Sequence, residues 1–229
     1  DDNGQDLRLS NRVNLFSDDP NDSPSRTLAR YVRESASRYV PEMDVNVVFR
    51  PDRVGRGGDH TPFNAQGFAG VRFTTAAEDL QKQHTPKDLF EFASPAYCAR
   101  VTRVNGAALA SLALAPKPPQ VTRDITAEEA SRGMTSQTNL ARGAKGTDAV
   151  LKWKSSAPET DLAGYAVVIR PSSSPFWERE IYVGNVNEYT LKNLSIDDVV
   201  IGIKAIDQQG VESLVSAYVL PRRNFAPAN

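Results

Sequence analysis

The sequence predicts an α/β unit followed by an all-β sandwich, and three observations lead to this prediction. An apolar run, a helical pattern and a second apolar run follow one another between residues 13 and 49, as in a β-α-β unit. The stiff segment Ala115-Pro116-Lys117-Pro118-Pro119 then interrupts the chain. Beyond it, apolar residues recur with a period of two between turn residues, which is typical of a β-sandwich.

These observations divide the chain into an α/β domain over residues 1–115, a proline-rich linker over 116–120 and a sandwich over 121–222. A length of 229 residues suits one or two domains. The sequence has 27 basic and 28 acidic residues and no basic stripe, so we expect no nucleic-acid partner. Its longest apolar stretches are far shorter than the roughly 20 residues that span a membrane, so we expect no membrane span.

In the α/β domain we expect a mostly parallel sheet with helices on both faces, built on short strands over residues 13–16, 45–49 and 70–73. Ser23 and Pro24 provide a cap and a first helical residue, and Pro41 ends that helix. A second, longer helix opens at Ser94-Pro95 and runs through Leu114.

The first helix carries many arginines. We expect these to form a solvated face, and the alternative is a surface for an anionic partner. The arginines concerned are Arg26, Arg30, Arg33 and Arg38.

The stretch from Arg56 to Asp88 contains both histidines of the chain. It begins Arg56-Gly57-Gly58-Asp59-His60-Thr61-Pro62-Phe63, where the glycines permit unusual backbone conformations and Asp59 or Thr61 can cap a short helix. His84 follows the strand over 70–73, just beyond a strand end, where open α/β sheets usually bind ligands.

From chemistry alone, His84 is a candidate metal ligand or acid/base, and the alternative is a surface histidine in a polar loop. A single imidazole makes no zinc site, because zinc needs three or four donors. A phosphate-binding role for Gly55 to Gly58 is disfavoured, because the Lys-Ser/Thr ending of a P-loop is missing.

The order Gly58-Asp59-His60-x-x-Phe63, Gly67, Val71-Arg72-Phe73 and His84-Thr85-x-x-Asp88 resembles the C-terminal half of the co-catalytic di-zinc aminopeptidases. This family includes secreted bacterial leucine aminopeptidases and glutamate carboxypeptidases. The resemblance covers roughly residues 20 to 115. It implies a zinc-dependent exopeptidase, an aminopeptidase by type, that hydrolyses peptide substrates with a metal-activated water held by two Zn²⁺ ions.

By the same resemblance, His84 is a terminal zinc ligand, and Thr85 or Asp88 orients its ring. Asp59 and His60 support the loop beside the pocket. Phe73 and Thr74 lie near that pocket, although a phenylalanine in a strand is more often a core residue. Glu78 and Asp79 are placed to meet a free amino terminus, and the alternative is a solvated loop.

The family's other metal ligands and its general-base glutamate are not found here in the expected order. No His-x-Asp precedes His84, and Glu128-Glu129 lies on the wrong side of it. We therefore expect this chain to be the later part of a longer enzyme, inactive alone, whose N-terminal part carries the remaining zinc ligands. The resemblance also implies a secreted or periplasmic protein.

In the second domain, Trp153, Gly164-Tyr165-x-Val167 and Leu191-x-x-Leu194 before Val199 resemble a fibronectin type III domain. Such domains space, orient or bind in secreted hydrolases. If no companion polypeptide exists, the alternative function is a non-catalytic binding or scaffold module with a peptidase-like fold and an interaction domain.

Overall fold

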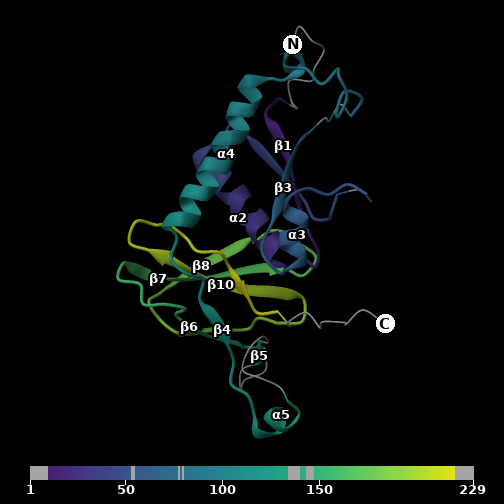
Figure 1. Cartoon of the computed structure of the whole chain (residues 1–229). Coiled ribbons are helices and arrows are strands. Elements are labelled where there is room, and N and C mark those ends of the chain that lie inside the picture. Colours follow the sequence, from purple (N-terminus) through teal and green to yellow (C-terminus); the bar gives the residue numbers. More distant parts are fainter. Residues whose placement is uncertain are drawn as a thin grey trace. The chain divides into compact units, whose positions relative to one another are not determined.

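The computed structural model describes residues 10–52, 55–76, 78, 80–133, 140–142 and 147–219. The chain divides into two compact units, residues 1–114 and 115–229, whose elements are labelled in Figure 1. The predicted end of the sandwich at residue 222 lies outside the described residues.

The first unit contains a three-stranded sheet in the order β2 (Asp44–Val48), β1 (Arg12–Ser17), β3 (Val71–Thr75). β1 and β2 are parallel, which confirms the α/β class, whereas β3 runs antiparallel to β1. Val13 pairs with Thr75, so β3 ends beside the start of β1. The loop that carries His84 therefore leaves the sheet at the amino-terminal ends of β1 and β2, opposite to their carboxyl ends.

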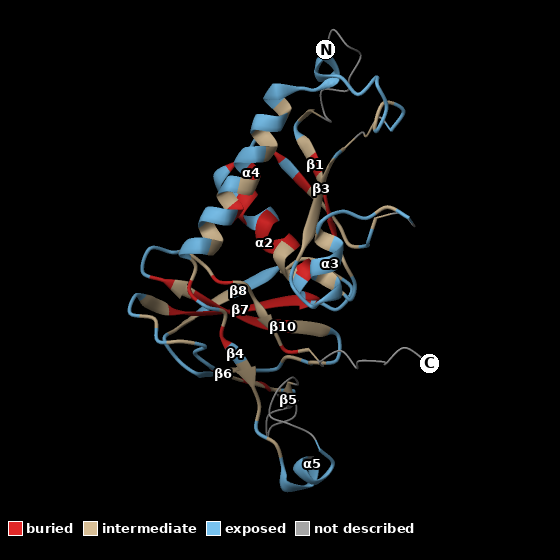
Figure 2. Cartoon of the chain, in the orientation of Figure 1, coloured by how far each residue is buried: buried red, intermediate tan, exposed pale blue. Residues whose placement is uncertain are grey.

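Two helices complete the core of this unit. α2 (Pro24–Tyr39) begins as predicted, because Pro24 is in its first turn and the Ser23 hydroxyl accepts the Arg26 amide at 3.1 Å. α4 (Pro95–Leu114) packs on α2 and buries Val104 and Ala108. Figure 2 shows this buried region in α2, α4 and the strands. Two shorter helices, α3 (His60–Ala65) and η1 (Phe90–Phe92), have no buried residue.

The arginine face of α2 was expected to be solvated, and for Arg26 and Arg30 that expectation is wrong. Arg26 is 7% exposed and Arg30 is 3% exposed. Their guanidinium carbons lie 5.7 and 5.4 Å from the centre of the Phe49 ring, within cation–π range. Burial is tolerated because both charges are also hydrogen-bonded.

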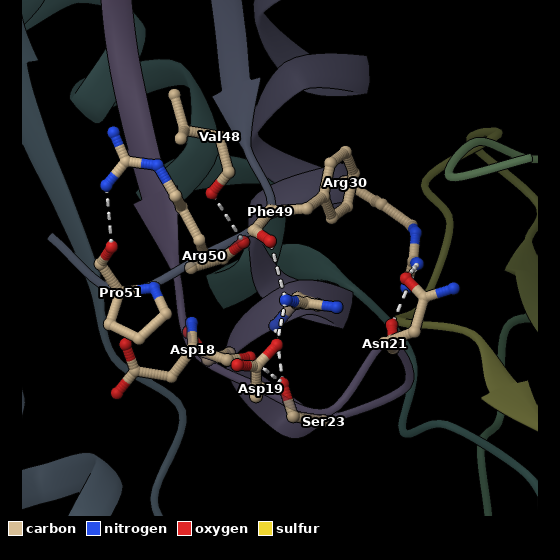
Figure 3. A network of polar contacts seen from close by, with 12 residues as sticks. Asp18, Asp19, Asn21, Ser23, Arg30, Val48, Phe49, Arg50 and Pro51 are labelled. Atoms are coloured by element: carbon tan, nitrogen blue, oxygen red, sulfur yellow. Dashed lines mark hydrogen bonds and ion pairs between the residues drawn. The ribbon is translucent and has the colours of Figure 1, made fainter.

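Figure 3 shows the partners of these two arginines. Arg26 pairs with Asp19 and donates to the Phe49 carbonyl at 2.7 Å. Arg30 donates to the Asn21 carbonyl at 2.8 Å. The network therefore joins α2 to the turn before it and to the end of β2.

The second unit is a two-sheet antiparallel structure that resembles a fibronectin type III sandwich. One sheet has the order β11-β10-β7-β8, and the other joins β4, β5 and β9 to β6. The strands are β4 (Gln120–Thr122), β5 (Ala141–Arg142), β6 (Ala149–Lys154), β7 (Leu162–Pro171), β8 (Arg179–Gly184), β9 (Glu188–Leu191), β10 (Val199–Asp207) and β11 (Ser216–Ala217). A short helix, α5 (Ala127–Ser131), lies between β4 and β5.

Inward side chains from both sheets form the second core. Trp153 on β6 is 2% exposed and meets Tyr165 on β7 edge-to-face, with ring centroids 5.5 Å apart. The two cores share no residue. None of the described helices has the length and hydrophobicity required to cross a membrane.

Candidate functional site

The candidate site is a cavity of about 490 Å³ in the first unit. Three segments line it: the glycine-rich loop after β2, the middle of β3 and the loop after β3. The lining residues are Gly55, Arg56, Gly57, Arg72, Glu78, Leu80, Gln83 and His84. His84 therefore lines the same cavity as Arg56 and Gly57, which begin the stretch from Arg56 to Asp88.

Arg56, Arg72 and Glu78 of the cavity lining take part in ion pairs, and Asp52 pairs with both arginines, at 3.9 Å from Arg56. Arg56 binds Glu78 through two hydrogen bonds, 2.8 and 2.9 Å long, in a bidentate arrangement. Arg72 binds Asp52 at 2.5 Å. Because Glu78 is engaged in this way, its carboxylate is not free to meet a substrate amino group. Asp79, its predicted companion, lies outside the described residues.

The Arg56 hydrogen bonds lower the pKa of Glu78 to about 2. Gln83, the neighbour of His84, also donates to the Glu78 carboxylate at 3.4 Å. The Glu78 side chain therefore ties the glycine-rich loop to the His84 loop, and it remains charged at neutral pH.

His84 itself is exposed and adopts a left-handed backbone conformation, with φ of 58°. Its imidazole makes no hydrogen bond or ion pair with any described residue. Thr85 folds the turn instead: its hydroxyl donates to the Lys82 carbonyl at 2.7 Å and accepts the Lys87 amide at 3.1 Å. Asp88 donates its amide to the Thr85 carbonyl at 3.0 Å, and its side chain is exposed.

His60 lies at the start of α3 and packs against two glycines. A Cβ atom at Gly58 would lie 3.1 Å from the His60 Nδ1 atom, and one at Gly70 would lie 3.1 Å from the His60 Cβ atom. Asp59 occupies the N-cap position but makes no capping hydrogen bond with its side chain. Instead, the Thr61 hydroxyl accepts the Gly58 amide at 3.3 Å. His60 does not line the cavity.

Phe73 and Thr74 point to opposite sides of β3, because side chains alternate along a strand. Phe73 packs against the buried core that includes Val13 and Leu15. Thr74 lies on the other side, the side of Arg72. Neither residue lines the cavity.

Within the described part of the chain, no group of three or more His, Cys, Asp or Glu residues is placed to hold a metal ion. His84 provides one nitrogen donor, and Glu78, the carboxylate among the described lining residues, is bound by Arg56. These residues do not fit zinc by themselves. A zinc site here requires further donors from outside the described residues.

Reasoning from sequence did not identify these ion pairs. Asp52, Arg56, Arg72 and Glu78 are ordinary charged residues in the sequence. The available signal was the presence of both charge signs, acidic at Asp52 and Glu78 and basic at Arg56 and Arg72, but pairing depends on how loops far apart in the sequence come together.

No family model matches the chain. Among solved structures, the second unit is similar to a fibronectin type III domain of human collagen XX (24% identity, TM-score 0.26, 35% of this chain and 84% of that one). It is also similar to the sixth fibronectin type III domain of human fibronectin type III domain containing protein 3 (20% identity, TM-score 0.26, 50% of this chain and 91% of that one).

Among curated proteins, a probable zinc metalloprotease of Leptosphaeria maculans is 37% identical over 211 residues, which are 88% of this chain and 44% of that protein. One of Pyrenophora tritici-repentis is 32% identical over 217 residues, 90% of this chain and 45% of that protein. One of Pyricularia oryzae is 36% identical over 204 residues, 84% of this chain and 38% of that protein. The chain spans less than half the length of these relatives. It is homologous to fungal probable zinc metalloproteases across most of both its units.

Proposed function

We propose that this chain is the C-terminal part of a secreted zinc-dependent exopeptidase of the aminopeptidase type, with peptides as substrates. Its homology to probable zinc metalloproteases supports the metal and the peptide-cleaving class. The resemblance of the stretch from Gly58 to Asp88 to di-zinc aminopeptidases supports the exopeptidase type and the two zinc ions. That resemblance also supports export.

The observation on which the proposal most depends is the state of His84. Its imidazole is exposed at the cavity and has no partner among the described residues. Meanwhile its loop is fixed by the Thr85 turn and by the Gln83–Glu78–Arg56 contacts. An anchored loop with a free ring nitrogen suits a metal ligand, but a ligating imidazole usually donates its second N–H to an orienting partner. The proposal therefore places that partner, like the other zinc ligands, in polypeptide outside the described residues.

The rest of the metal site is proposed to lie in the preceding polypeptide, together with the general-base glutamate. The relatives are more than twice as long as the matched region, so they contain additional chain that is not represented here. The cavity would then be the part of the substrate pocket that this chain contributes, with Arg56 and Glu78 as positioning residues rather than catalytic ones.

An assay on the complete protein tests the reaction class. We expect hydrolysis of an aminoacyl-anilide and no hydrolysis of the same anilide with an acetylated amino group. His84→Asn should reduce the rate by about 100-fold or more, because asparagine is a poor zinc ligand. Lys87→Ala, an exposed residue of the same loop, is the control and should leave the rate unchanged. Equal cleavage of both anilides would contradict the aminopeptidase type.

A non-catalytic scaffold is the second candidate. The observation that favours it is that the described residues bring no three metal donors together. N-terminal sequencing and intact mass of the protein from its source separate the two functions. A longer polypeptide with His-x-Asp and Glu-Glu motifs supports the enzyme, and a mature protein without them supports the scaffold.

A further inference from the structure

A second cavity, of about 330 Å³, lies in the sandwich between β8 and β9. These strands are the edges of two different sheets. In the described structure β8 pairs only with β7, and β9 pairs only with β6. One backbone edge of each strand is therefore without a strand partner, and the cavity is a groove that runs between the two edges.

The floor of this groove is apolar. Ile181 lies opposite Val167, and Tyr189 lies opposite Leu151, and both partners are fully buried. Ile181 and Tyr189 therefore point inward, toward the core of the sandwich. Leu191 and Leu194 complete the apolar lining. An apolar side chain from a ligand could contact these four side chains, while Thr190 and Asn193 add polar atoms to the same lining.

Two positively charged side chains, Arg179 and Lys192, also line the groove. Arg179 occupies the inward row of β8, two positions before Ile181 and opposite Ile169, but it is exposed. Lys192 follows directly after β9 and is also exposed. Neither side chain makes a hydrogen bond or an ion pair with any described residue.

The described acidic residues near the groove form no ion pair with Arg179 or Lys192, and three of them have other partners. Glu180 binds Lys204 at 2.7 Å, and Glu188 binds Lys152 at 3.2 Å. Asp148 accepts the Asn193 amide at 2.9 Å. Glu178 precedes Arg179 but makes no ion pair with it. The groove thus combines an apolar floor with two unpaired positive charges.

We propose that this groove binds an extended acidic peptide, with an apolar side chain on the floor and carboxylates on Arg179 and Lys192. An extended segment suits a site between two strand edges, because its backbone can pair with an open edge while alternate side chains point inward. Two cations with no internal partner select carboxylates over neutral or basic side chains.

The test uses the full chain and a blocked peptide of about six residues that alternates valine with glutamate. The matched probe has glutamine in place of glutamate. Amide chemical-shift mapping should place the glutamate peptide at Tyr189, Leu191 and Leu194, and titration gives its Kd. We expect added salt to weaken this binding, because the charges are exposed.

The double variant R179A/K192A should bind the glutamate peptide about tenfold more weakly, which corresponds to about 1.4 kcal/mol. K117A/K154A is the matched control, since both lysines are exposed in the same unit, and it should bind like the wild type. Equal binding of the glutamine peptide, or shifts away from the groove, would overturn the proposal. So would an absence of binding, which would leave Arg179 as an inward charge that protects an edge strand.

Discussion

The environment of Glu78 differs from what its sequence context suggests. In the sequence, Glu78 is one of several acids in a polar loop. In the structure its carboxylate accepts hydrogen bonds from the Nη1 and Nη2 atoms of Arg56 and from the Gln83 side chain. A carboxylate that accepts several charged or polar donors is stabilised in its ionised form. Its contribution is therefore to hold two loops together.

This pairing predicts a specific dependence of stability on pH. The pKa of Glu78 is lowered from 4.5 to about 2 in the folded chain. Its contribution should therefore be complete above about pH 4.5 and should be lost as the pH falls through about 2. At neutral pH, Glu78→Gln should cost about 1 kcal/mol of unfolding free energy.

Urea unfolding of the wild type and of Glu78→Gln between pH 7 and pH 2 measures this contribution. The difference between the two proteins should shrink toward zero at the acidic end. Glu91→Gln, at an exposed residue of η1, serves as the control and should show no such trend. A constant Glu78→Gln difference across this range would exclude the Arg56–Glu78 bond as its source.

At the scale of elements, α3 is attached to β3 through a very close contact at Gly70. A Cβ atom there would lie 3.0 Å from the Asn64 Oδ1 atom and 3.1 Å from the His60 carbonyl oxygen. The Gly70 amide also donates to Asn64 at 2.7 Å. Gly70→Ala should therefore lower the unfolding free energy by about 1–3 kcal/mol, because α3 must move away.

Gly106→Ala is the contrasting variant. Gly106 lies inside α4, and a Cβ atom there meets nothing within 4 Å. Alanine should stabilise this helix by about 0.5–1 kcal/mol. Denaturant midpoints of the two variants should therefore move in opposite directions. A neutral Gly70→Ala would show that α3 is not packed on Gly70 as described.

The buried arginines of α2 give the second prediction at this scale. Arg30→Ala removes the hydrogen bond to the Asn21 carbonyl, the contact with Phe49 and the ion pair with Asp22. We expect a loss of about 2–3 kcal/mol, because buried partners are left unpaired. Arg103→Ala, whose side chain is 68% exposed, should change stability by less than about 0.5 kcal/mol. Equal effects of the two substitutions in thermal unfolding would contradict the buried network.

Local signals predicted the elements well. Ser23-Pro24 identified the start of α2, and the helical spacing up to Leu114 identified α4. The burial of Arg26 and Arg30 was not predictable in the same way, because it depends on Phe49 and on the turn at residues 18–22 lying against α2. The antiparallel direction of β3 was also missed, since a short apolar run carries no information about strand direction.

At the scale of the whole molecule, the two units contain separate cores around Leu15 and Trp153, and the homology to probable zinc metalloproteases includes most of both units. The sequence motifs led to the histidine and to the sandwich. They did not reveal the Arg56–Glu78 pair or the groove between β8 and β9, because both arise where distant segments meet. Such sites depend on tertiary structure more than on any local pattern.

The central claim is that His84 binds a zinc ion whose other ligands lie in polypeptide outside this chain. Zinc content of the complete protein, measured by plasma mass spectrometry in the wild type, in His84→Asn and in the Lys87→Ala control, tests it most directly. Asparagine tolerates the left-handed backbone at this position, so the substitution should remove the donor without unfolding the loop. We predict that His84→Asn loses zinc relative to the wild type while Lys87→Ala retains it. Equal zinc content in all three proteins would contradict the claim.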